Sequence, residues 1–596
     1  MTETPWREPA RSALLALALL ALRVDAATAA QTTWADPAGS CNGESPCFTT
    51  LGAAVANAGP PPATVFAFPG TYAESVDLGA MGSALVGGSP GELSVVSVDA
   101  SGQPAPGAVV DPGALGGPGT GSAVFANAFP APVTLDGLAV RSPDVSGIDL
   151  HVATGAVRLA RITADASPSG NGVAVLIDSG DVVIEDSSAR LNGASGLVAG
   201  SAAGAVTVTD SFAERNSGAG GSFLGSRVEV TDSGAEGNDT NGLVIASDDA
   251  TAARLGATGN GEIGVWVAPL TVAGGSAALA EIEASGNASG VVLGFHPAGF
   301  TFVDGEITGC TATANLDTGV TAEALSLRLD DVAATGNGGI GITAFAADAH
   351  LTACLAASNS AGVVASGGQV TLLGCSATDN GPFAGSLVEG NGFVLANVDR
   401  AEIADAHALD NDFGWLILDF DGAAAPMGMD PAAVRLELER LGGGRPRALA
   451  GKGGPAFQAI SIVGSRTEGS AEASMRVGLR PGGTLAVHCS DFVANGPTGL
   501  ALVTDNVVDA RSNFWGDPSG PTHPGNPGGA GDVIQDLAVG FPGTVIYDPF
   551  LAAPAGAADC PLPAGLPEIP TLDPASLLTF GLALVLAAWG LLWRRP

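Results

Sequence analysis

The sequence predicts an all-β protein in which short strands repeat with a period of about 22 residues and stack into a solenoid. Three observations predict it. Asparagines recur at nearly constant spacing, an alanine stands three residues before each of them, and short stretches of alternating apolar residues follow. Strict alternation is the periodicity of a β-strand. Because so short a repeat cannot bury a core alone, successive copies have to stack.

The chain begins with a segment that predicts export. Residues 1–30 hold Arg7 and Arg11, then an apolar run, then small residues at Ala27 and Ala29 that fit a cleavage site. We expect this signal peptide to be removed near residue 30. The rest of the chain is then expected outside the cytoplasm.

Residues 31–65 are expected to form an N-terminal cap. Cys41 and Cys47 lie close together in a polar stretch, and an exported protein can keep a disulfide, so we expect these two to be joined. The other five cysteines leave an odd number, with no spacing typical of a zinc site. They are Cys310, Cys354, Cys375, Cys489 and Cys560.

Residues 66–550 carry the repeat. The asparagines that mark it stand at 192, 216, 238, 260, 287, 315, 337, 359, 380 and 411. The position five residues before them never holds a charge, and Cys310, Cys354 and Cys375 occupy it. These cysteines are interpreted as small buried apolar residues in equivalent places of successive coils.

Glycine follows most of the asparagines after three or four residues, as at Gly196, Gly220 and Gly319, and then alternation begins. Asn tolerates left-handed backbone and Gly favours it, so the breaks between strands fall where turns are expected. The pattern fades at residues 421–481. Asn411 and Asn495 are 84 residues apart, close to four repeats, which favours degenerate coils over a protruding loop there.

The end of the chain predicts a linker and a membrane segment. Residues 551–566 are rich in Pro and Ala, and residues 575–593 are apolar enough to span a bilayer before Arg594 and Arg595. The stretch between them resembles the C-terminal sorting signals of bacterial surface proteins named for the motif present here as Ile569, Pro570, Thr571 and Leu572. That resemblance implies cleavage of the 567–596 segment by an envelope sorting protease. A plain membrane anchor is the alternative.

The repeat resembles the right-handed parallel β-helix of the pectin-lyase-like superfamily over residues 50–550, with three strands per coil and asparagines stacked in one turn. Leucine-rich repeats also carry a periodic asparagine, but they need regular leucines and usually a helical arc, which this chain lacks. Members of the superfamily include polysaccharide lyases and hydrolases. The resemblance therefore implies a fold that serves both enzymes and passive rods.

Charge limits the partners. Lys and Arg number 23 against 60 Asp and Glu, a net charge of −37, so binding of nucleic acid is not expected. Asp186, Asp210 and Asp232 recur six residues before asparagines, and stacked carboxylates there could recruit calcium. The alternative is that each begins a turn and points into water. No other cofactor is indicated.

We therefore expect an exported cell-surface rod, non-catalytic and structural or adhesive. The alternatives are a polysaccharide-active lyase or hydrolase, or a calcium-stabilised carbohydrate-binding module. A clustered Asp/Arg or Asp/Asp group on one sheet would favour catalysis, whereas scattered carboxylates would favour the rod. No catalytic residue is identifiable from the sequence alone.

Overall fold

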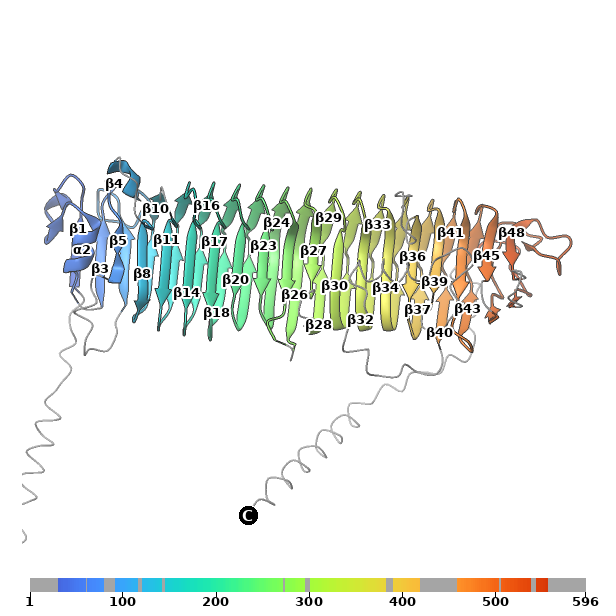
Figure 1. The fold of residues 1–596 in the computed structure, drawn as a ribbon. Helices are drawn as coiled ribbons and strands as arrows, with labels where there is room; N and C mark the ends of the chain where they lie inside the picture. The colour runs from blue at the N-terminus through green and yellow to red at the C-terminus, as the bar shows by residue number, and fades with distance from the viewer. Residues whose placement is uncertain are drawn as a thin grey trace, which may run out of the picture.

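The computed structural model describes residues 31–59, 62–79, 92–115, 121–141, 145–271, 274–294, 301–381, 390–418, 458–502, 505–536 and 543–555. These residues form one parallel β-solenoid of the right-handed type, drawn as a long rod in Figure 1. The segments predicted as signal peptide, sorting motif and membrane segment, and residues 556–566 of the predicted linker, lie outside the described residues. Among the residues described, no helix is long and apolar enough to span a bilayer.

Three sheets make the walls of the rod. The first sheet contains β1 (Gln31–Ala35), β3 (Ala63–Ala67), β6 (Leu93–Ser97), β9 (Val133–Asp136), β12 (Val157–Ala160), β15 (Val182–Glu185), β18 (Ala205–Thr209), β21 (Arg227–Thr231), β24 (Asp249–Thr258), β26 (Ser276–Ser285), β28 (Phe302–Thr308), β30 (Val320–Asp330), β32 (Ile340–Thr352), β34 (Ala361–Leu373), β37 (Arg400–Ala404), β40 (Ala459–Val463), β43 (Thr484–His488), β46 (Val507–Asp509) and β49 (Thr544–Ile546).

The second sheet contains β5 (Val76–Asp77), β8 (Val124–Phe129), β11 (Ile148–Val152), β14 (Val173–Ile177), β17 (Leu197–Ser201), β20 (Gly221–Leu224), β23 (Leu243–Ala246), β25 (Ile263–Ala268), β27 (Ser289–Leu293), β36 (Asn391–Ala396), β39 (Phe413–Leu418), β42 (Ala473–Gly478), β45 (Thr498–Leu502) and β48 (Gly531–Gln535). Strands β30, β32 and β34 bend around a corner and belong to both sheets.

The third sheet has mostly three-residue strands. It contains β4 (Gly70–Tyr72), β7 (Ala108–Val110), β10 (Leu138–Arg141), β13 (Thr163–Asp165), β16 (Ser188–Arg190), β19 (Phe212–Glu214), β22 (Gly234–Glu236), the ends of β24 and β26, β29 (Thr311–Thr313), β31 (Ala333–Thr335), β33 (Leu355–Ala357), β35 (Ser376–Thr378), β38 (His407–Leu409), β41 (Arg466–Glu468) and β44 (Asp491–Val493). The short β2 (Cys47–Phe48) pairs with β1, and β47 (Pro521–Thr522) with β48.

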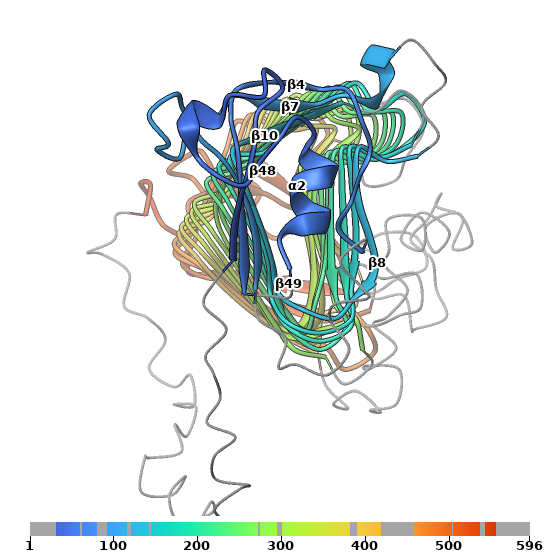
Figure 2. The ribbon, with the colours of Figure 1, turned by 90° about the vertical axis from the view of Figure 1, so that its left-hand side faces the viewer.

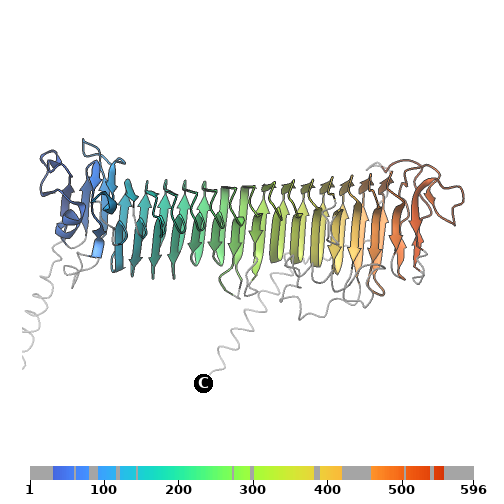
Figure 3. The same cartoon turned by 45° about the horizontal axis from the view of Figure 1, so that its top comes forward.

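Every pairing between these strands is parallel, and the first sheet runs from β1 to β49 without a break in its hydrogen-bonded order. Its nineteen strands, spaced by about 4.8 Å, give a rod roughly 85 Å long. Figure 3 shows the rod turned by 45° from the view of Figure 1. One continuous core of buried apolar side chains fills it from end to end.

The asparagines predicted to mark the repeat form a buried ladder. In each of nine steps, from Asn192 to Asn411, the Nδ2 atom of one asparagine donates to Oδ1 of the next at 2.8–3.2 Å. The second Nδ2 hydrogen goes to a backbone carbonyl of the preceding coil, as from Asn315 to Ala284. All ten asparagines are at most 3% exposed. Such burial is tolerated because the amides satisfy one another.

The ladder explains the glycines and alanines of the repeat. A Cβ atom at Gly319 would lie 2.8 Å from Nδ2 of Asn337 and 2.8 Å from Cβ of Ala334, and most of the equivalent glycines meet the same pair of residue types. Glycine is therefore needed at this position because there is no room for a side chain. The residue that it contacts in the next coil, Ala334 in the case of Gly319, also has to be small.

The uncharged position five residues before the asparagines is buried. Cys310, Cys354 and Cys375 are at most 1% exposed and carry free thiols. Burial raises the pKa of Cys310 to about 11. The neighbouring Cys375 thiol and burial raise the pKa of Cys354. These thiols are packing residues, as the sequence pattern indicates.

Helix α2 (Leu51–Asn57) lies across the N-terminal opening of the solenoid, as the end-on view in Figure 2 shows. Its buried face consists of Leu51, Ala54 and Val55. The Glu74 carboxylate accepts hydrogen bonds from the backbone N–H groups of Leu51 and Gly52, which have no partner inside the helix. The helix thus covers the apolar core at the N-terminal end of the solenoid, where no preceding coil is present to cover it.

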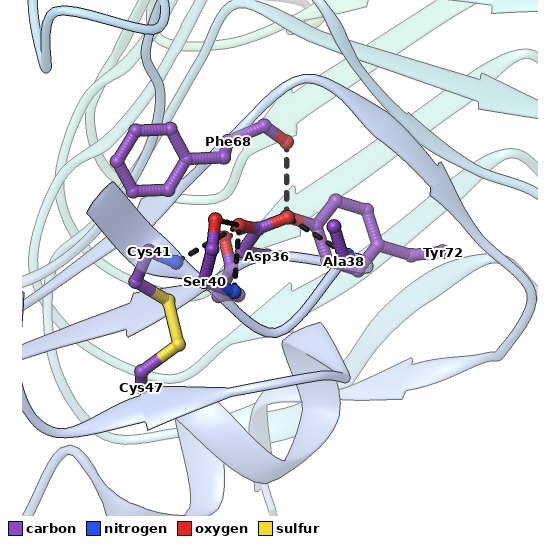
Figure 4. The surroundings of a disulfide bond; sticks show 8 residues. Asp36, Ala38, Ser40, Cys41, Cys47, Phe68 and Tyr72 are labelled. Carbon is purple, nitrogen blue, oxygen red and sulfur yellow. Dashed lines mark hydrogen bonds between the residues drawn. A yellow bond between two sulfur atoms is a disulfide. The ribbon is translucent and has the colours of Figure 1, made fainter. Parts of the chain in front are cut away.

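The N-terminal region differs from the expectation in one respect. Residues 31–65 contribute more than a cap, because β1 pairs in full register with β3 and so belongs to the stack. The structure joins Cys41 to Cys47 within this region, the pairing expected from the sequence, and Figure 4 shows the bond beside Asp36. Both oxygens of that carboxylate accept hydrogen bonds from residues 38–41, whose turn also contains the short helix η1 (Cys41–Gly43). A second short helix, η3 (Pro112–Leu115), follows β7.

In the described part of 421–481, residues 458–481, the coils are regular rather than degenerate, because β40, β41 and β42 continue the three sheets. Strand β40 pairs directly with β37, so no coil separates Ala404 from Ala459 in the first sheet. Residues 419–457, which come between β39 and β40 in the chain, lie outside the described residues. Asn411 and Asn495 are two coil steps apart, with Ser470 between them in the hydrogen-bonded order, so the 84-residue interval does not correspond to four repeats.

Candidate functional site

Asp186, Asp210 and Asp232 occupy equivalent places in three successive coils, at the turn from the first sheet to the third. Each has left-handed backbone, with φ between 47° and 50°. Backbone N–H groups of all three donate to carbonyls of the next coil. The register inferred from the asparagines is therefore the register of the structure. Aspartate is favoured in this conformation, so the turn explains it without a bound ion, although Arg161, Arg254 and Glu281 adopt the same conformation at equivalent turns.

These carboxylates do not converge on one point. All three side chains are exposed, and Asp232 is paired with Arg254, whose Nε and Nη2 atoms lie 2.6 Å from its two oxygens. This hydrogen-bonded pair holds the pKa of Asp232 below its ordinary value. No group of three or more His, Cys, Asp or Glu suited to a metal ion occurs among the residues the structure describes. The donor set does not fit the calcium site that the sequence suggested.

The same turn borders a hollow of about 550 Å³, which we call the glycine hollow. Its floor is formed by Gly234 and Gly256. The other residues that border it are Asp210, Ser211, Phe212, Asp232, Ser233, Ala235, Glu236, Arg254 and Thr258, of which Ser211, Ser233 and Ala235 are buried. The floor lies in the third sheet, where β19, β22 and β24 run in parallel. Two of the three predicted aspartates thus line a cavity, while Asp186 lies one coil outside it.

Phe212 and the glycines shape the hollow. The Phe212 side chain is 39% exposed, and its ring lies so close to Gly234 that a Cβ atom there would be 2.9 Å from it. A Cβ atom at Gly256 would meet nothing within 4 Å. The ring therefore forms one wall, and open space lies above the second glycine.

Charge is unevenly distributed around the hollow. Asp210, Asp232 and Glu236 contribute three carboxylates against the single guanidinium of Arg254. Hydrogen bonding to Asp232, with further attraction from Glu281 and Asp210, raises the pKa of Arg254. Arg254 is the one cation among the residues that line the hollow.

A second polar group lies on the outer face of the first sheet, and we call it the charged strip. It consists of Asp304, Glu306, Arg328, Asp330, Asp348 and His350. Strands β28, β30 and β32 bring them together, since Arg328 is in register with both Glu306 and His350. Arg328 lies 3.8 Å from Glu306 and 3.5 Å from Asp330, and His350 lies 3.2 Å from Asp348.

Inspection of single residues missed this strip. The six histidines show no motif one by one. The strip appears only when the outward positions of adjacent strands are aligned, which places Glu306, Arg328 and His350 in one row. The alternation of each strand and the period of the repeat carry that signal.

A third polar group belongs to the C-terminal end of the solenoid. Nε2 of His523 lies 3.2 Å from Asp536, and its Nδ1 accepts from the backbone N–H of Gly525 at 3.0 Å. The His523 and Asp536 side chains are largely buried. In the same C-terminal coils, the Trp515 ring stacks on the Phe492 ring, with ring centroids 4.5 Å apart. These contacts close the last coils and so have a structural explanation.

Comparison with known proteins gives fold relatives only. No family model and no curated protein matches the chain. Among solved structures, the A-module of mannuronan C-5 epimerase AlgE6 from Azotobacter vinelandii aligns with 55% of this chain and 88% of its own, at 15% identity and a TM-score of 0.33. The AlgE4 A-module of the same organism covers 62% and 92%, at 15% identity and a TM-score of 0.25.

Pectate lyase Pel9A also aligns, over 68% of this chain and 84% of its own, at 12% identity and a TM-score of 0.22. At such values the alignments concern the solenoid architecture and transfer no active site. Function has to be argued from this chain's own residues.

Proposed function

We propose that the protein is an exported β-solenoid rod displayed on the bacterial envelope, with a structural or adhesive role and no catalytic activity. The observation that carries the proposal is the unbroken first sheet, which runs from β1 to β49 over a single core. The nine-step asparagine ladder ties consecutive coils together along much of that length. A long scaffold with buried inter-coil bonds suits display at a distance from a membrane.

The terminal segments supply the route in this proposal. The 1–30 signal directs export, and the motif Ile569 to Leu572 with the apolar segment behind it directs the chain to an envelope sorting protease. A membrane anchor that is not cleaved would give the same exposure.

Surface labelling tests the display. The full chain is expressed in a bacterium that carries an envelope sorting protease, and intact cells are probed with antibody against residues 31–555. Surface signal is expected, and Pro570→Ala should leave a larger, membrane-bound species if the motif is cleaved. Protein found only in the cytoplasm would refute the proposal.

The charged strip supports a second candidate, a polysaccharide-active enzyme. His350, oriented by Asp348, is a possible proton acceptor, and Arg328 offers positive charge to a uronate carboxylate. This is the clustered Asp/Arg group on one sheet that would favour catalysis. Against it, the Arg328 and His350 side chains are 61% and 48% exposed, so water screens their charges.

A product assay separates the two candidates. The protein is incubated with oligogalacturonate, alginate and neutral glucans, while unsaturated products and reducing ends are followed. The rod proposal expects no turnover. Turnover that His350→Ala and Arg328→Ala abolish, and that Arg158→Ala on the same sheet leaves unchanged, would establish the enzyme instead.

A further inference from the structure

The outer face of the third sheet is interrupted at one place. Along the first outward position of its strands, side chains are present at Thr163, Ser188 and Phe212 and again from Glu283 onward, but Gly234 and Gly256 stand between them. The Phe212 ring accounts for Gly234, because any side chain there would collide with it.

Gly256 has no such explanation within the fold. It is exposed, its φ is not positive, and a Cβ atom would meet nothing within 4 Å. Neither backbone conformation nor packing requires glycine at this position. Because Gly256 has no side chain, the space above it stays open and forms part of the glycine hollow.

The walls around this space differ in chemistry. On one side the Phe212 ring offers an exposed apolar surface. On a second side the exposed Asp232–Arg254 pair, joined by two bonds of 2.6 Å, presents donors and acceptors. Glu236 and Thr258 add acceptor and hydroxyl groups on the third side. An aromatic wall facing paired polar groups suits a sugar ring, whose C–H face is apolar and whose hydroxyls need directional partners.

The negative charge around the hollow disfavours anionic ligands. Three carboxylates and one guanidinium leave an excess of two negative charges around the hollow, and the whole chain carries −37. An anionic saccharide would be repelled by both. The volume of about 550 Å³ lies within the range of roughly 300–1,000 Å³ usual for small-ligand sites.

We propose that the glycine hollow binds a neutral saccharide, with one sugar ring against Phe212 and its hydroxyls between the Asp232–Arg254 pair and Glu236. This inference rests on the proposed display function and names the partner class of the adhesive rod.

Saturation-transfer NMR tests the binding. The full chain, solubilised in a detergent without a sugar head group, is mixed in turn with cellohexaose, maltohexaose, laminarihexaose and, for comparison, hexagalacturonate. Transfer to at least one neutral hexasaccharide and none to hexagalacturonate is expected. Transfer to none of the neutral probes, or to hexagalacturonate alone, would overturn the inference.

Matched variants locate the site. Gly256→Leu fills the hollow where there is room for a side chain, so the fold is retained while binding should weaken at least about tenfold. Ala333→Leu makes a similar change farther along the same face, next to a natural leucine at 355, and should bind as the wild type does. Unchanged binding by Gly256→Leu would overturn the proposal.

Phe212→Ala tests the aromatic wall and should weaken binding about fivefold or more. Binding unaffected by this change would contradict the placement of the sugar ring. Surface labelling of the same variants separates the two proposals: a displayed protein that binds none of the neutral probes refutes the saccharide site alone, and a protein that binds but stays in the cytoplasm refutes the display alone.

Discussion

At the scale of single residues, one amide ladder dictates several neighbouring amino acids. Each asparagine is buried, so it needs a partner in the coil before and the coil after. Close contact between coils then allows only glycine at one position and alanine at another. The pattern of Ala, Asn and Gly could be recognised in the sequence because the three residues contact one another in the structure, which restricts all three positions together.

Gly319→Ala tests this coupling. The added Cβ atom would lie 2.6 Å from the Gly341 carbonyl oxygen and 2.8 Å from Nδ2 of Asn337, both of which are fixed by the ladder. We expect a loss of about 2–4 kcal/mol of stability, measured by denaturant unfolding. Gly256→Ala is the control, since nothing lies within 4 Å of its Cβ, and it should change stability by less than about 0.5 kcal/mol. Equal effects of the two changes would contradict the explanation.

Glu323 predicts a pH dependence. It lies on the outer face of the second sheet in register with Phe345, and burial raises its pKa to about 7. The pKa of this carboxyl is higher in the folded state than its value of 4.5 in the unfolded state. Its contribution to stability is therefore fully present at pH values below 4.5 and is lost as the pH rises through about 7.

Glu323→Gln should therefore matter little at pH 4.5 and stabilise the protein at pH 8, by up to about 3 kcal/mol. Thermal unfolding at both pH values measures the difference. Glu306→Gln, on the exposed charged strip, is the control and should show no such increase. A Glu323→Gln effect that is the same at both pH values would refute the role of desolvation.

At the scale of elements, the strands were more predictable than the elements that end or interrupt them. The alternation of apolar residues predicted the strands, and the spacing of the asparagines predicted how successive coils align. The interval from Asn411 to Asn495 was misread as four repeats because its 84 residues come close to a multiple of the repeat, although the two asparagines are only two coil steps apart. The membership of β1 in the stack was missed because its partner β3 is separated from it by the capping helix rather than by a repeat.

The helix α2 predicts a local end effect. Val55 is fully buried against the first coils, so Val55→Asp would place a carboxylate on the apolar end of the core. We expect a loss of about 3 kcal/mol or more, with faster hydrogen exchange in β1 and β3 and end-to-end association of the exposed coil. Ala56→Asp, on the exposed side of the helix, is the control. Unchanged exchange in β1 and β3 would mean that the first coil does not depend on the helix.

At the scale of the whole molecule, the sites were the least predictable part. The three aspartates were placed in the correct register, but whether stacked carboxylates share an ion depends on where the side chains point and on the arginine of the next coil. Arg254 follows Asp232 by 22 residues and neutralises it. The glycine hollow was not recognisable from the sequence because Gly234 and Gly256 look like turn glycines in a chain that has 87 glycines.

The net charge of −37 leads to a last prediction, which concerns calcium. Like charges spread over a rod repel one another, so salt should raise the melting temperature by screening. If calcium acts only through ionic strength, as expected where the described residues offer no three-ligand group, CaCl₂ and NaCl at equal ionic strength should stabilise alike, and a chelator should change nothing. Asp210→Asn should then leave the response to calcium as it was. A stabilisation specific to micromolar calcium, lost in that variant, would instead mean that the stacked aspartates rearrange around the ion.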